Sequence, residues 1–432
     1  MMVISFSVSL NLFSCMKAIF TLSFYLFIAT HTLTGQGVIE TPPPNYIRTV
    51  IFLGASEYSG VPIIRLGEPL YLEFDDVIGD EANYYYTIEH FNYDWTPSEL
   101  LKTEFLEGFD NVRITDYQNS FNTLQLFSHY ELEIPNTDTR GLKVSGNYLL
   151  KVFNEEKELV FSRKFMVYEP LTSVEVTVRK SREVKFIQTR QVVNFEVNSP
   201  DFIIRTPEES VWAVILQNNN LKTAIFNVRP QYHVGTSLIY KYDQLTSFWA
   251  GNEYLNFDSK DLRAATVKIR YIDVQELYHH YLFRDQIRAF QPYTYNPDIN
   301  GKFVVRNYQA ENDDIEADYV WTHFALATPE PFEDGEVHLF GEFNNFQLDE
   351  TTRLNYNFET GNYETARLFK QGFYDYKYVF LRNEGILDEG FISGNFVSTE
   401  NEYTVLIYYL PPGGRYTRII GMGQATSLNI MN

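Results

Sequence analysis

Cysteine is nearly absent from this sequence, and its scarcity excludes several kinds of protein. The 432 residues include a single cysteine, Cys15. One thiol cannot form an intramolecular disulfide, and it cannot supply the ligands of a cysteine zinc site or an iron–sulfur cluster. A small disulfide-stapled scaffold is therefore excluded.

Positive charge is also scarce. Lysine and arginine total 35 against 56 aspartates and glutamates, which gives a formal net charge of −21. A non-specific nucleic-acid binder needs a basic surface to neutralise phosphates, and electrostatic binding to anionic lipid needs a basic patch. The composition argues against both classes of protein.

Long apolar runs are lacking beyond the N-terminus. After Met16 and one lysine, residues 18–29 form an apolar run, and small polar residues follow it. This layout is typical of a secretory signal peptide, because the run is too short to span about 30 Å of hydrocarbon as a helix. We predict a signal peptide at residues 1–35, with Met16 as an alternative start, and no direct membrane insertion of the exported chain.

Common catalytic signatures are missing as well. The sequence has no HExxH, GxSxG, P-loop or GxGxxG motif, and these mark the commonest hydrolases and nucleotide binders. Glu276 and His279 have the spacing of a carboxylate-bridged metal site, but a second such pair is missing. Residues 298–301 resemble part of a calcium loop, although the register fails and a hairpin turn is the better interpretation. We expect no enzyme activity, no cofactor and no metal.

What the sequence does contain is alternation of apolar and polar residues. Residues 70–75, 174–179, 193–197 and 267–271 all show a period of two, the pattern of half-buried antiparallel strands. Turns rich in asparagine and glycine separate such runs, and only a short helix is expected, at residues 99–105. We predict an all-β fold of tandem immunoglobulin-like antiparallel β-sandwich domains.

Length and turn positions divide the chain into domains. At roughly 150 residues per domain the length fits two to three units, each with its own core. We place boundaries at Pro170 and near residue 300. The predicted parts are a first sandwich at 38–169, a second at 171–300, a third at 301–412 and a polar C-terminal tail at 413–432.

Aromatic residues are abundant, with 32 tyrosines and 35 phenylalanines. Tyrosine offers a large contact area at low entropic cost and keeps a hydroxyl for hydrogen bonding, which favours interfaces. The alternative role is to fill thin sandwich cores. Two groups spaced along single strands are the candidate partner-binding residues: Tyr84, Tyr85 and Tyr86, and Tyr374, Tyr376 and Tyr378.

A series of short motifs begins with HFNYDWTPSEL at residues 90–100 and ends with SGNY at residues 145–148. As a set, they resemble the first domain of the plug protein family of the type IX secretion system. From the residues alone, Trp95 and Pro97 anchor a turn and Asp94 or Ser98 caps the short helix. The motif residues, all interpreted as structural, are Asp94, Trp95, Pro97, Ser98, Gly108, Asn122, His129, Tyr130, Gly146, Asn147 and Tyr148.

The resemblance implies a role in protein secretion. Plug proteins are exported to the periplasm, associate with the outer membrane and dock on the periplasmic mouth of a large translocation barrel. They are not enzymes, and they seal that opening when no cargo is engaged. The implied partner of this chain is therefore the translocation barrel.

A second resemblance concerns residues 337–346 and 372–378. They are similar to the immunoglobulin-like sandwich of glycogen-binding modules, which stack sugar on an aromatic ring. Phe346 stands at the candidate position. A shared fold without sugar binding is the preferred interpretation, and a periplasmic or surface carbohydrate-binding protein is the alternative function.

Overall fold

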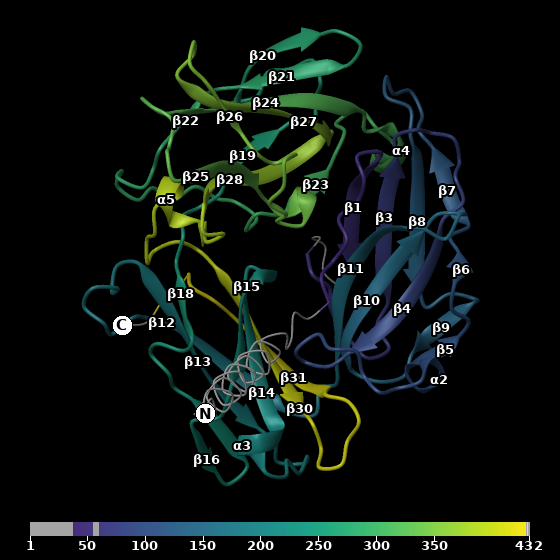
Figure 1. Cartoon of the computed structure of the whole chain (residues 1–432), viewed down its shortest axis with the longest axis vertical. Coiled ribbons are helices and arrows are strands. Elements are labelled where there is room, and N and C mark those ends of the chain that lie inside the picture. Colours follow the sequence, from purple (N-terminus) through teal and green to yellow (C-terminus); the bar gives the residue numbers. More distant parts are fainter. Residues whose placement is uncertain (1–37, 55–59, 429, 431–432) are drawn as a thin grey trace, which may run out of the picture.

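The chain folds into three mainly antiparallel β-sandwiches (Figure 1). The structure is a computed structural model that describes residues 38–54, 60–428 and 430. The all-β sandwich architecture predicted from the alternating pattern is confirmed. The predicted signal peptide at 1–35 lies outside the described residues. Within the described part of the chain, no helix is long and apolar enough to cross a membrane.

The first domain, on the right in Figure 1, packs two sheets face to face. Its elements are β1 (Ile47–Leu53), β2 (Ile63–Arg65), β3 (Leu70–Asp76), β4 (Tyr85–Phe91), α2 (Lys102–Phe105), β5 (Leu106–Gly108), β6 (Val112–Arg113), β7 (Asp116–Asn119), β8 (Ser128–Ile134), β9 (Thr139–Leu142), β10 (Gly146–Phe153) and β11 (Leu159–Tyr168). One sheet has the order β1-β3-β8-β7 and the other β2-β11-β10-β4-β6, and β5 pairs with β9 beside them.

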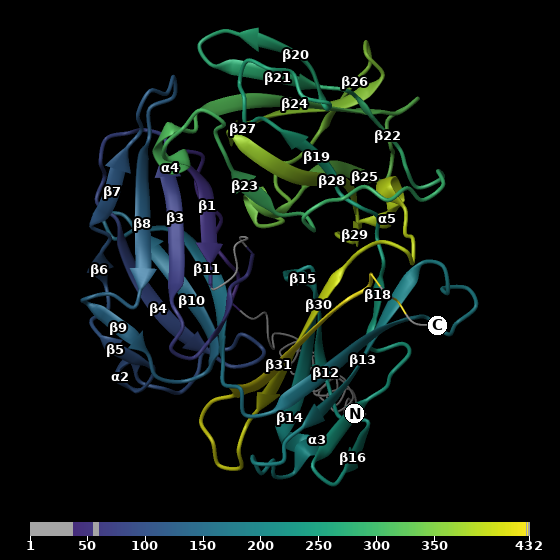
Figure 2. The ribbon, with the colours of Figure 1, turned by 180° about the vertical axis from the view of Figure 1, so that it is seen from behind.

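The second domain is built from two distant parts of the sequence. Its elements are β12 (Ser173–Lys180), β13 (Arg190–Asn198), α3 (Pro207–Ser210), β14 (Val211–Gln217), β15 (Asn220–Val228), β16 (Tyr232–Val234), β17 (Ser237–Tyr240), β18 (Ser247–Trp249), β30 (Glu402–Tyr409) and β31 (Arg418–Thr426). One sheet joins β12, β13, β17 and β16, with β18 on β13, and the other has the order β15-β14-β30-β31. Figure 2 shows the yellow C-terminal strands among the teal ones.

The third domain is inserted between those two parts. Its elements are β19 (Leu255–Asp258), β20 (Ile269–Val274), β21 (Tyr278–Leu282), β22 (Asp285–Gln286), β23 (Phe303–Val305), α4 (Asp313–Glu316), β24 (Tyr319–Ala327), β25 (Gly335–Phe340), the 3-10 helix η1 (Glu342–Asn344), β26 (Asn355–Asn357), β27 (Asn362–Lys370), β28 (Gly372–Arg382), β29 (Leu387–Asp388) and α5 (Gly390–Ser393). β28 pairs with β19, β23, β25 and β29, and the outer sheet has the order β20-β21-β24-β27-β26, with β22 on β24.

These pairings differ from the predicted boundaries beyond the first domain. Strands β19 to β22 precede residue 300 but belong to the third domain, and β30 and β31 complete the second. The predicted polar tail at 413–432 contains β31, where Ile419 and Ile420 are fully buried. Alternation along one strand does not show which distant strand pairs with it, because pairing is set by tertiary contacts.

Helices are few and short among the described residues, and the predicted one at 99–105 is α2. It begins after Leu101, because Glu104 accepts a hydrogen bond from the Leu101 N–H at 2.8 Å. The expected capping residues act elsewhere: Asp94 accepts from the Thr96 N–H at 3.1 Å, and Ser98 Oγ lies 2.8 Å from a ring nitrogen of His90.

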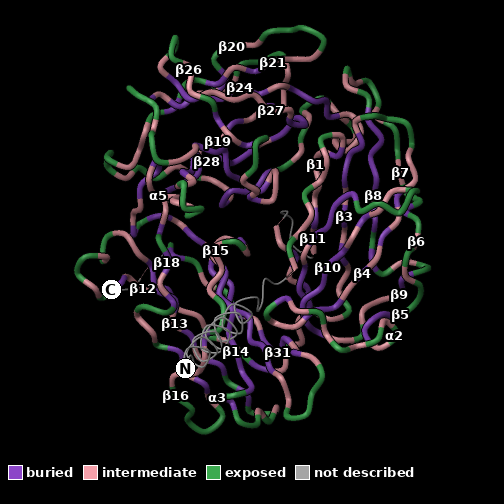
Figure 3. Tube along the Cα trace, viewed as in Figure 1, coloured by how far each residue is buried: buried purple, intermediate pink, exposed green. Residues whose placement is uncertain are grey.

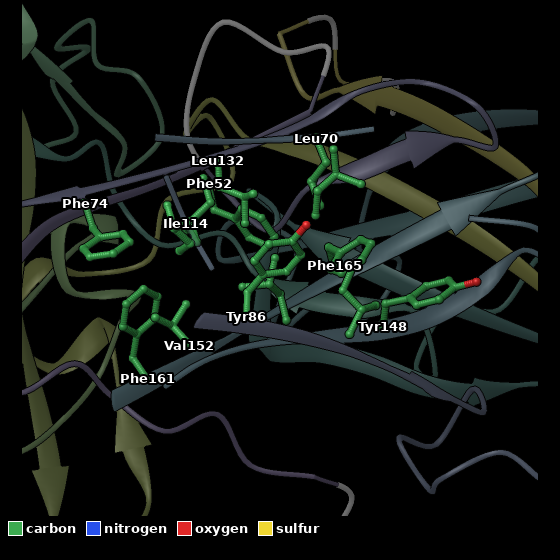
Figure 4. Close-up of a cluster of buried hydrophobic side chains, with 14 of the residues drawn as sticks. Phe52, Leu70, Phe74, Tyr86, Ile114, Leu132, Tyr148, Val152, Phe161 and Phe165 are labelled. Carbon is green, nitrogen blue, oxygen red and sulfur yellow. The ribbon is translucent and has the colours of Figure 1, made fainter. Parts of the chain in front are cut away.

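Burial follows the sandwich layers, with purple inner strands and green outer loops in Figure 3. Figure 4 shows that aromatic rings dominate the first core. Tyr148 stacks on Phe165 with ring centroids 5.2 Å apart, and its hydroxyl donates to the Val144 carbonyl at 2.7 Å. Phe74 stacks in the same way on Tyr130 at 5.1 Å. A tyrosine ring is stable in a core where its hydroxyl finds a partner.

Candidate functional site

The structure places five of the six candidate tyrosines in domain cores. Tyr84, Tyr86, Tyr374, Tyr376 and Tyr378 are each no more than 2% exposed, whereas Tyr85 is half-buried. The shared face of residues 374, 376 and 378 is the inner face of the third sandwich. These five tyrosines therefore contribute to stability and offer no contact area to a partner, which corrects their candidate role.

The buried tyrosines use their hydroxyls to bind buried carboxylates, which explains why tyrosine stands at these core positions. Tyr376 and Tyr378 both donate to the buried Asp285 carboxylate, at 2.9 and 3.0 Å. Tyr84 donates to Asp76 at 2.7 Å. Each ring packs as a hydrophobic group while its hydroxyl donates a hydrogen bond to a carboxylate. The main role of these tyrosines is therefore to stabilise the domain cores.

Several motif residues of the first domain shape its backbone. Trp95 adopts φ = 62°, a left-handed conformation that is rare for a bulky residue, and its side chain is 4% exposed. Pro97 forms a bridge to Phe91 and is exposed, as is Asp94. The turn after β4 thus holds the indole of Trp95 inward and leaves Pro97 at the surface.

Two glycines of the motif set leave room for neighbouring groups. Gly146 (φ = 148°) lies against the His90 ring, and any Cβ there would collide with that ring. Gly108 (φ = 106°) lies against the Asp138 carbonyl in the same way. Asn122, with φ = 58°, is exposed in the loop before β8. Close approach and positive φ explain why these positions carry glycine or asparagine.

Asn147 links the first domain to the second. Its Nδ2 donates to the Asn92 carbonyl at 2.8 Å, and its Oδ1 accepts from the Tyr408 hydroxyl at 2.7 Å. Tyr93 stacks on Trp212 nearby, with centroids 4.7 Å apart. The apolar cluster around this junction comprises Phe91, Trp95, Leu149, Met166, Trp212, Val214, Leu216, Leu406, Tyr408 and Ile419.

His129 lies where the first domain meets the third. Its Nδ1 is 2.7 Å from Asp75, whose other carboxylate oxygen accepts from Tyr319 at 2.6 Å and from Lys370 at 2.7 Å. Burial raises the pKa of Asp75, but Lys370 and His129 outweigh it, so the pKa lies below its ordinary value. The buried Asp75–Lys370 pair joins β3 to β27 across the junction.

The chain crosses between the second and third domains twice, once between β18 and β19 and once between α5 and β30. The two crossing segments are hydrogen-bonded to each other. The Gly251 N–H donates to the Asn395 side-chain oxygen at 3.0 Å, and Asn252 Nδ2 donates to the Ser393 carbonyl at 2.7 Å. A domain held by two crossing segments cannot swing about a single linker. Each of the three domains is thus fixed to the other two.

A partly exposed group of aromatic side chains remains on the outer sheet of the third domain. We name it the aromatic shelf, and it consists of Tyr271 on β20, His279 and Tyr281 on β21, and Trp321 and His323 on β24. Tyr281 stacks between Tyr271, at 4.2 Å, and His323, at 4.0 Å. Tyr271 is 47% exposed. The shelf lies at the top of Figure 1, away from the other two domains.

The shelf combines stacked rings with polar groups at its edge. His279 Nδ1 lies 2.9 Å from His323 Nε2. Burial, and then His279, lower the pKa of His323 to about 4, so this ring is neutral at neutral pH. A hollow of about 990 Å³ beside it is lined by Tyr271, Arg284 and Glu364 among others. Flat rings with a polar rim are typical of protein interfaces.

The other sequence candidates do not form sites. Glu276 lies in an exposed turn, and the alternation of β21 puts His279 outside and His280 inside. Residues 298–301 form a turn, in which Gly301 has φ = 85°. Phe346 is 5% exposed and packs on Phe340 at 5.0 Å. Its ring is therefore not available for stacking on a sugar.

Comparisons with known proteins bear on the first domain most directly. The family model described as type 9 secretion system plug protein first domain matches residues 47–169. The first domain of this chain belongs to the type IX secretion system plug family. All eleven motif residues lie inside the matched region of this plug domain.

The plug-family chain also has a solved structural relative over most of its length. A crystal structure of a hypothetical protein from Parabacteroides merdae is 33% identical, with a TM-score of 0.86, covering 90% of this chain and 99% of that one. A biofilm-associated protein domain, at 8% identity and a TM-score of 0.15, covers 91% of this chain and 61% of its own and is too dissimilar to argue from. No curated protein matches the sequence.

The aromatic shelf was not predicted from the sequence. Of its residues, only His279 was considered as a site residue, as part of a possible metal site with Glu276. The available signal was the alternation in YHHYLF at 278–283 and YVWTHFALA at 319–327, which puts aromatic side chains on one face of each strand. That the two strands are parallel neighbours follows only from the fold.

Proposed function

We propose that this protein is a non-enzymatic periplasmic plug that binds the outer-membrane translocation barrel of the type IX secretion system. It seals the periplasmic opening of that barrel when no cargo is engaged. Membership of the plug family supports this role, and the predicted signal peptide supports export to the periplasm.

The observation that carries the proposal is the fixed arrangement of the three sandwiches. The junctions are held by buried hydrogen bonds and ion pairs, among them Asn147–Tyr408 and Asp75–Lys370. A seal over a wide opening has to keep its shape when one side is loaded. Three domains that are each fixed to the other two meet that requirement, whereas domains on flexible linkers do not.

We assign the aromatic shelf as a contact surface for the translocation barrel. A stable interface of about 1,600 Å² needs a few buried aromatic anchors within a polar rim. Tyr271, Tyr281 and Trp321 supply rings that are already stacked and therefore lose little side-chain entropy on binding. The acidic surface elsewhere disfavours non-specific binding to acidic partners.

Co-purification tests this function. The protein is captured from detergent-solubilised outer membranes, and bound proteins are identified by mass spectrometry. Recovery of the translocation barrel in near-equal amount is the expected result. Its absence from membranes in which the barrel is otherwise detected contradicts the proposal.

Carbohydrate binding remains the second candidate, because of a cleft between the second and third domains. The cleft, of about 680 Å³, is lined by Asn218, Asn220, Trp249 and Glu389 among others, and Trp249 is 47% exposed. Amide groups beside an exposed indole are suited to sugar hydroxyls and a sugar face. Binding on a glycan array that is lost with Trp249→Ala favours this alternative, and no binding rejects it.

A further inference from the structure

Acidic side chains gather on the outer face of β3 and β8, under the third domain. Glu73 and Glu131 are direct partners across these strands, and Asp116 on β7 faces Glu131 from the other side. Asp314, on α4, belongs to the third domain. Like charges opposite one another are destabilising in a sheet. Among the described residues, no lysine or arginine forms an ion pair with Glu73, Glu131 or Asp314.

His129 points into this acidic group with an unused nitrogen. The side chain is 3% exposed, and its Nε2 is buried without a hydrogen-bond partner. Its nearest acceptor is Glu131, at 3.8 Å. The Nδ1–H donates to Asp75 at 2.7 Å, because an ionised carboxylate only accepts, so the ring presents Nε2 to the acidic group.

A histidine held in this way by a carboxylate is the arrangement that metal-binding histidines use. The carboxylate fixes the ring orientation and tautomer and raises the basicity of the free nitrogen. Ligand atoms of Glu73, His129 and Asp314 all lie within 4.8 Å of one another. Ligand atoms at about 2.0–2.2 Å from one tetrahedral ion lie about 3.3–3.6 Å apart. The two half-buried carboxylates must therefore rotate toward His129 to close the site.

We propose that Glu73, His129 and Asp314 bind one Zn²⁺ ion at the junction of the first and third domains. Lys370 offsets the charge of Asp75, and the dication offsets Glu73 and Asp314. An imidazole nitrogen favours Zn²⁺ over Ca²⁺ or Mg²⁺, which take oxygen ligands. The ion ties β3 and β8 to α4. This inference does not rest on the proposed plug function.

The three proposed ligands do not form a recognisable sequence motif. Positions 73, 129 and 314 come from two domains and have no local spacing, so the sequence led to the expectation of no metal. Only β3–β8 pairing and the packing of α4 on that sheet bring them together. The Phe121 N–H donates to the Ile315 carbonyl at 2.9 Å, which holds α4 in place.

Calorimetric titration of Zn²⁺ tests the site, using untagged protein that has been treated with a chelator. The variants are Glu73→Gln and Asp314→Asn, which lie at half-buried positions and spare the buried His129. Asp313→Asn, the neighbouring residue on α4, is the matched control for loss of one charge. We expect one Zn²⁺ per chain, with affinity reduced at least about tenfold in both variants and unchanged in the control.

A stability measurement separates loss of metal from loss of fold. The melting temperature of the wild-type protein rises with added Zn²⁺, because the ion binds only the folded state, and the rise is absent in Glu73→Gln and Asp314→Asn. Ca²⁺ at the same concentration leaves it unchanged. Absence of Zn²⁺ binding by the wild-type protein, or equal binding by folded Glu73→Gln and Asp314→Asn variants, overturns the proposal.

Discussion

At the scale of single residues, buried hydroxyls and carboxylates hold the domain junctions together. Tyr408 shows the effect most simply, because one hydrogen bond to Asn147 crosses from the second domain to the first. Both groups are buried, so neither can exchange this bond for water. Removing the hydroxyl therefore leaves an unsatisfied oxygen on Asn147.

We expect Tyr408→Phe to lower the free energy of unfolding by about 1–3 kcal/mol, the cost of a lost buried hydrogen bond with one partner left behind. Urea denaturation measures the change. Tyr232→Phe is the control, since Tyr232 is 57% exposed, and it should leave stability unchanged. Equal midpoints for the wild type and Tyr408→Phe would show that this bond does not stabilise the junction.

Two buried carboxyls make stability depend on pH. Burial, and to a smaller extent Asp298, raise the pKa of Glu253 from 4.5 to about 7. Burial and then Asp298 raise the pKa of Asp375 from 3.8 to about 8. The folded state thus holds these protons more tightly than the unfolded state. Their contribution to stability is complete below pH 4 and is lost as pH rises through 7 to 8.

We therefore expect the melting temperature to fall as the buffer is changed from about pH 6 to about pH 9. Glu253→Gln and Asp375→Asn retain an acceptor oxygen and cannot ionise, so each should reduce the fall. Glu156→Gln, at an exposed position, is the control and should leave the fall in melting temperature unchanged. Differential scanning calorimetry across this pH range measures the change in melting temperature. If neither Glu253→Gln nor Asp375→Asn alters the dependence of melting temperature on pH, these two carboxyls are not its cause.

At the scale of elements, strand β31 carries the clearest structural surprise. Its two glycines lie against β12 and the residue before it: a Cβ on Gly421 would collide with Thr172, and one on Gly423 would collide with the Val174 carbonyl. Glycine inside a strand often marks close approach of another backbone. The prediction of a polar tail at residues 413–432 is therefore wrong for this segment, which is a strand packed on its neighbour.

We expect Gly421→Val to destabilise the protein by about 1–3 kcal/mol through overpacking against β12. Gln424→Val, on the same strand with an exposed side chain, is the control for added β-branched bulk. Thermal unfolding of both variants measures the difference. Stability of Gly421→Val equal to that of Gln424→Val would mean that β31 does not pack on β12 in this way.

The sequence was a good guide to local structure and a poor one to long-range pairing. Alternation at 174–178 correctly predicted β12, and that at 70–74 predicted β3. Period two also predicted that Tyr374, Tyr376 and Tyr378 share a face. It did not show that this face is the inner one, because burial depends on the sheet that packs against it.

The candidate sites were harder to predict for the same reason. The shelf residues Tyr281 and His323 come from strands joined by a crossover of about forty residues, and their contact depends on parallel pairing of β21 with β24. His129 was singled out through its family motif, but Lys370, which contacts the same Asp75 carboxylate, lies 241 residues away (370 − 129). The spacing of residues in the sequence does not predict such long-range contacts.

At the scale of the whole molecule, the proposed function assigns the aromatic shelf to the contact with the translocation barrel. We expect the double variant Tyr271→Ala, Tyr281→Ala to weaken binding to the translocation barrel at least about tenfold, the equivalent of about 1.4 kcal/mol. Tyr232→Ala is the matched control, as an exposed tyrosine in the second domain. Binding to the purified barrel measures the effect, and an unchanged affinity removes the shelf from the interface.

If the protein closes a pore, the permeability of the outer membrane depends on it. The gene is deleted in cells that retain the translocation barrel, and entry of large antibiotics that the intact outer membrane excludes is measured as growth inhibition. We expect increased sensitivity, which the wild-type protein reverses and the shelf double variant reverses only in part. Unchanged permeability in the deletion strain, with the barrel present at its normal level, would show that the protein does not seal the barrel.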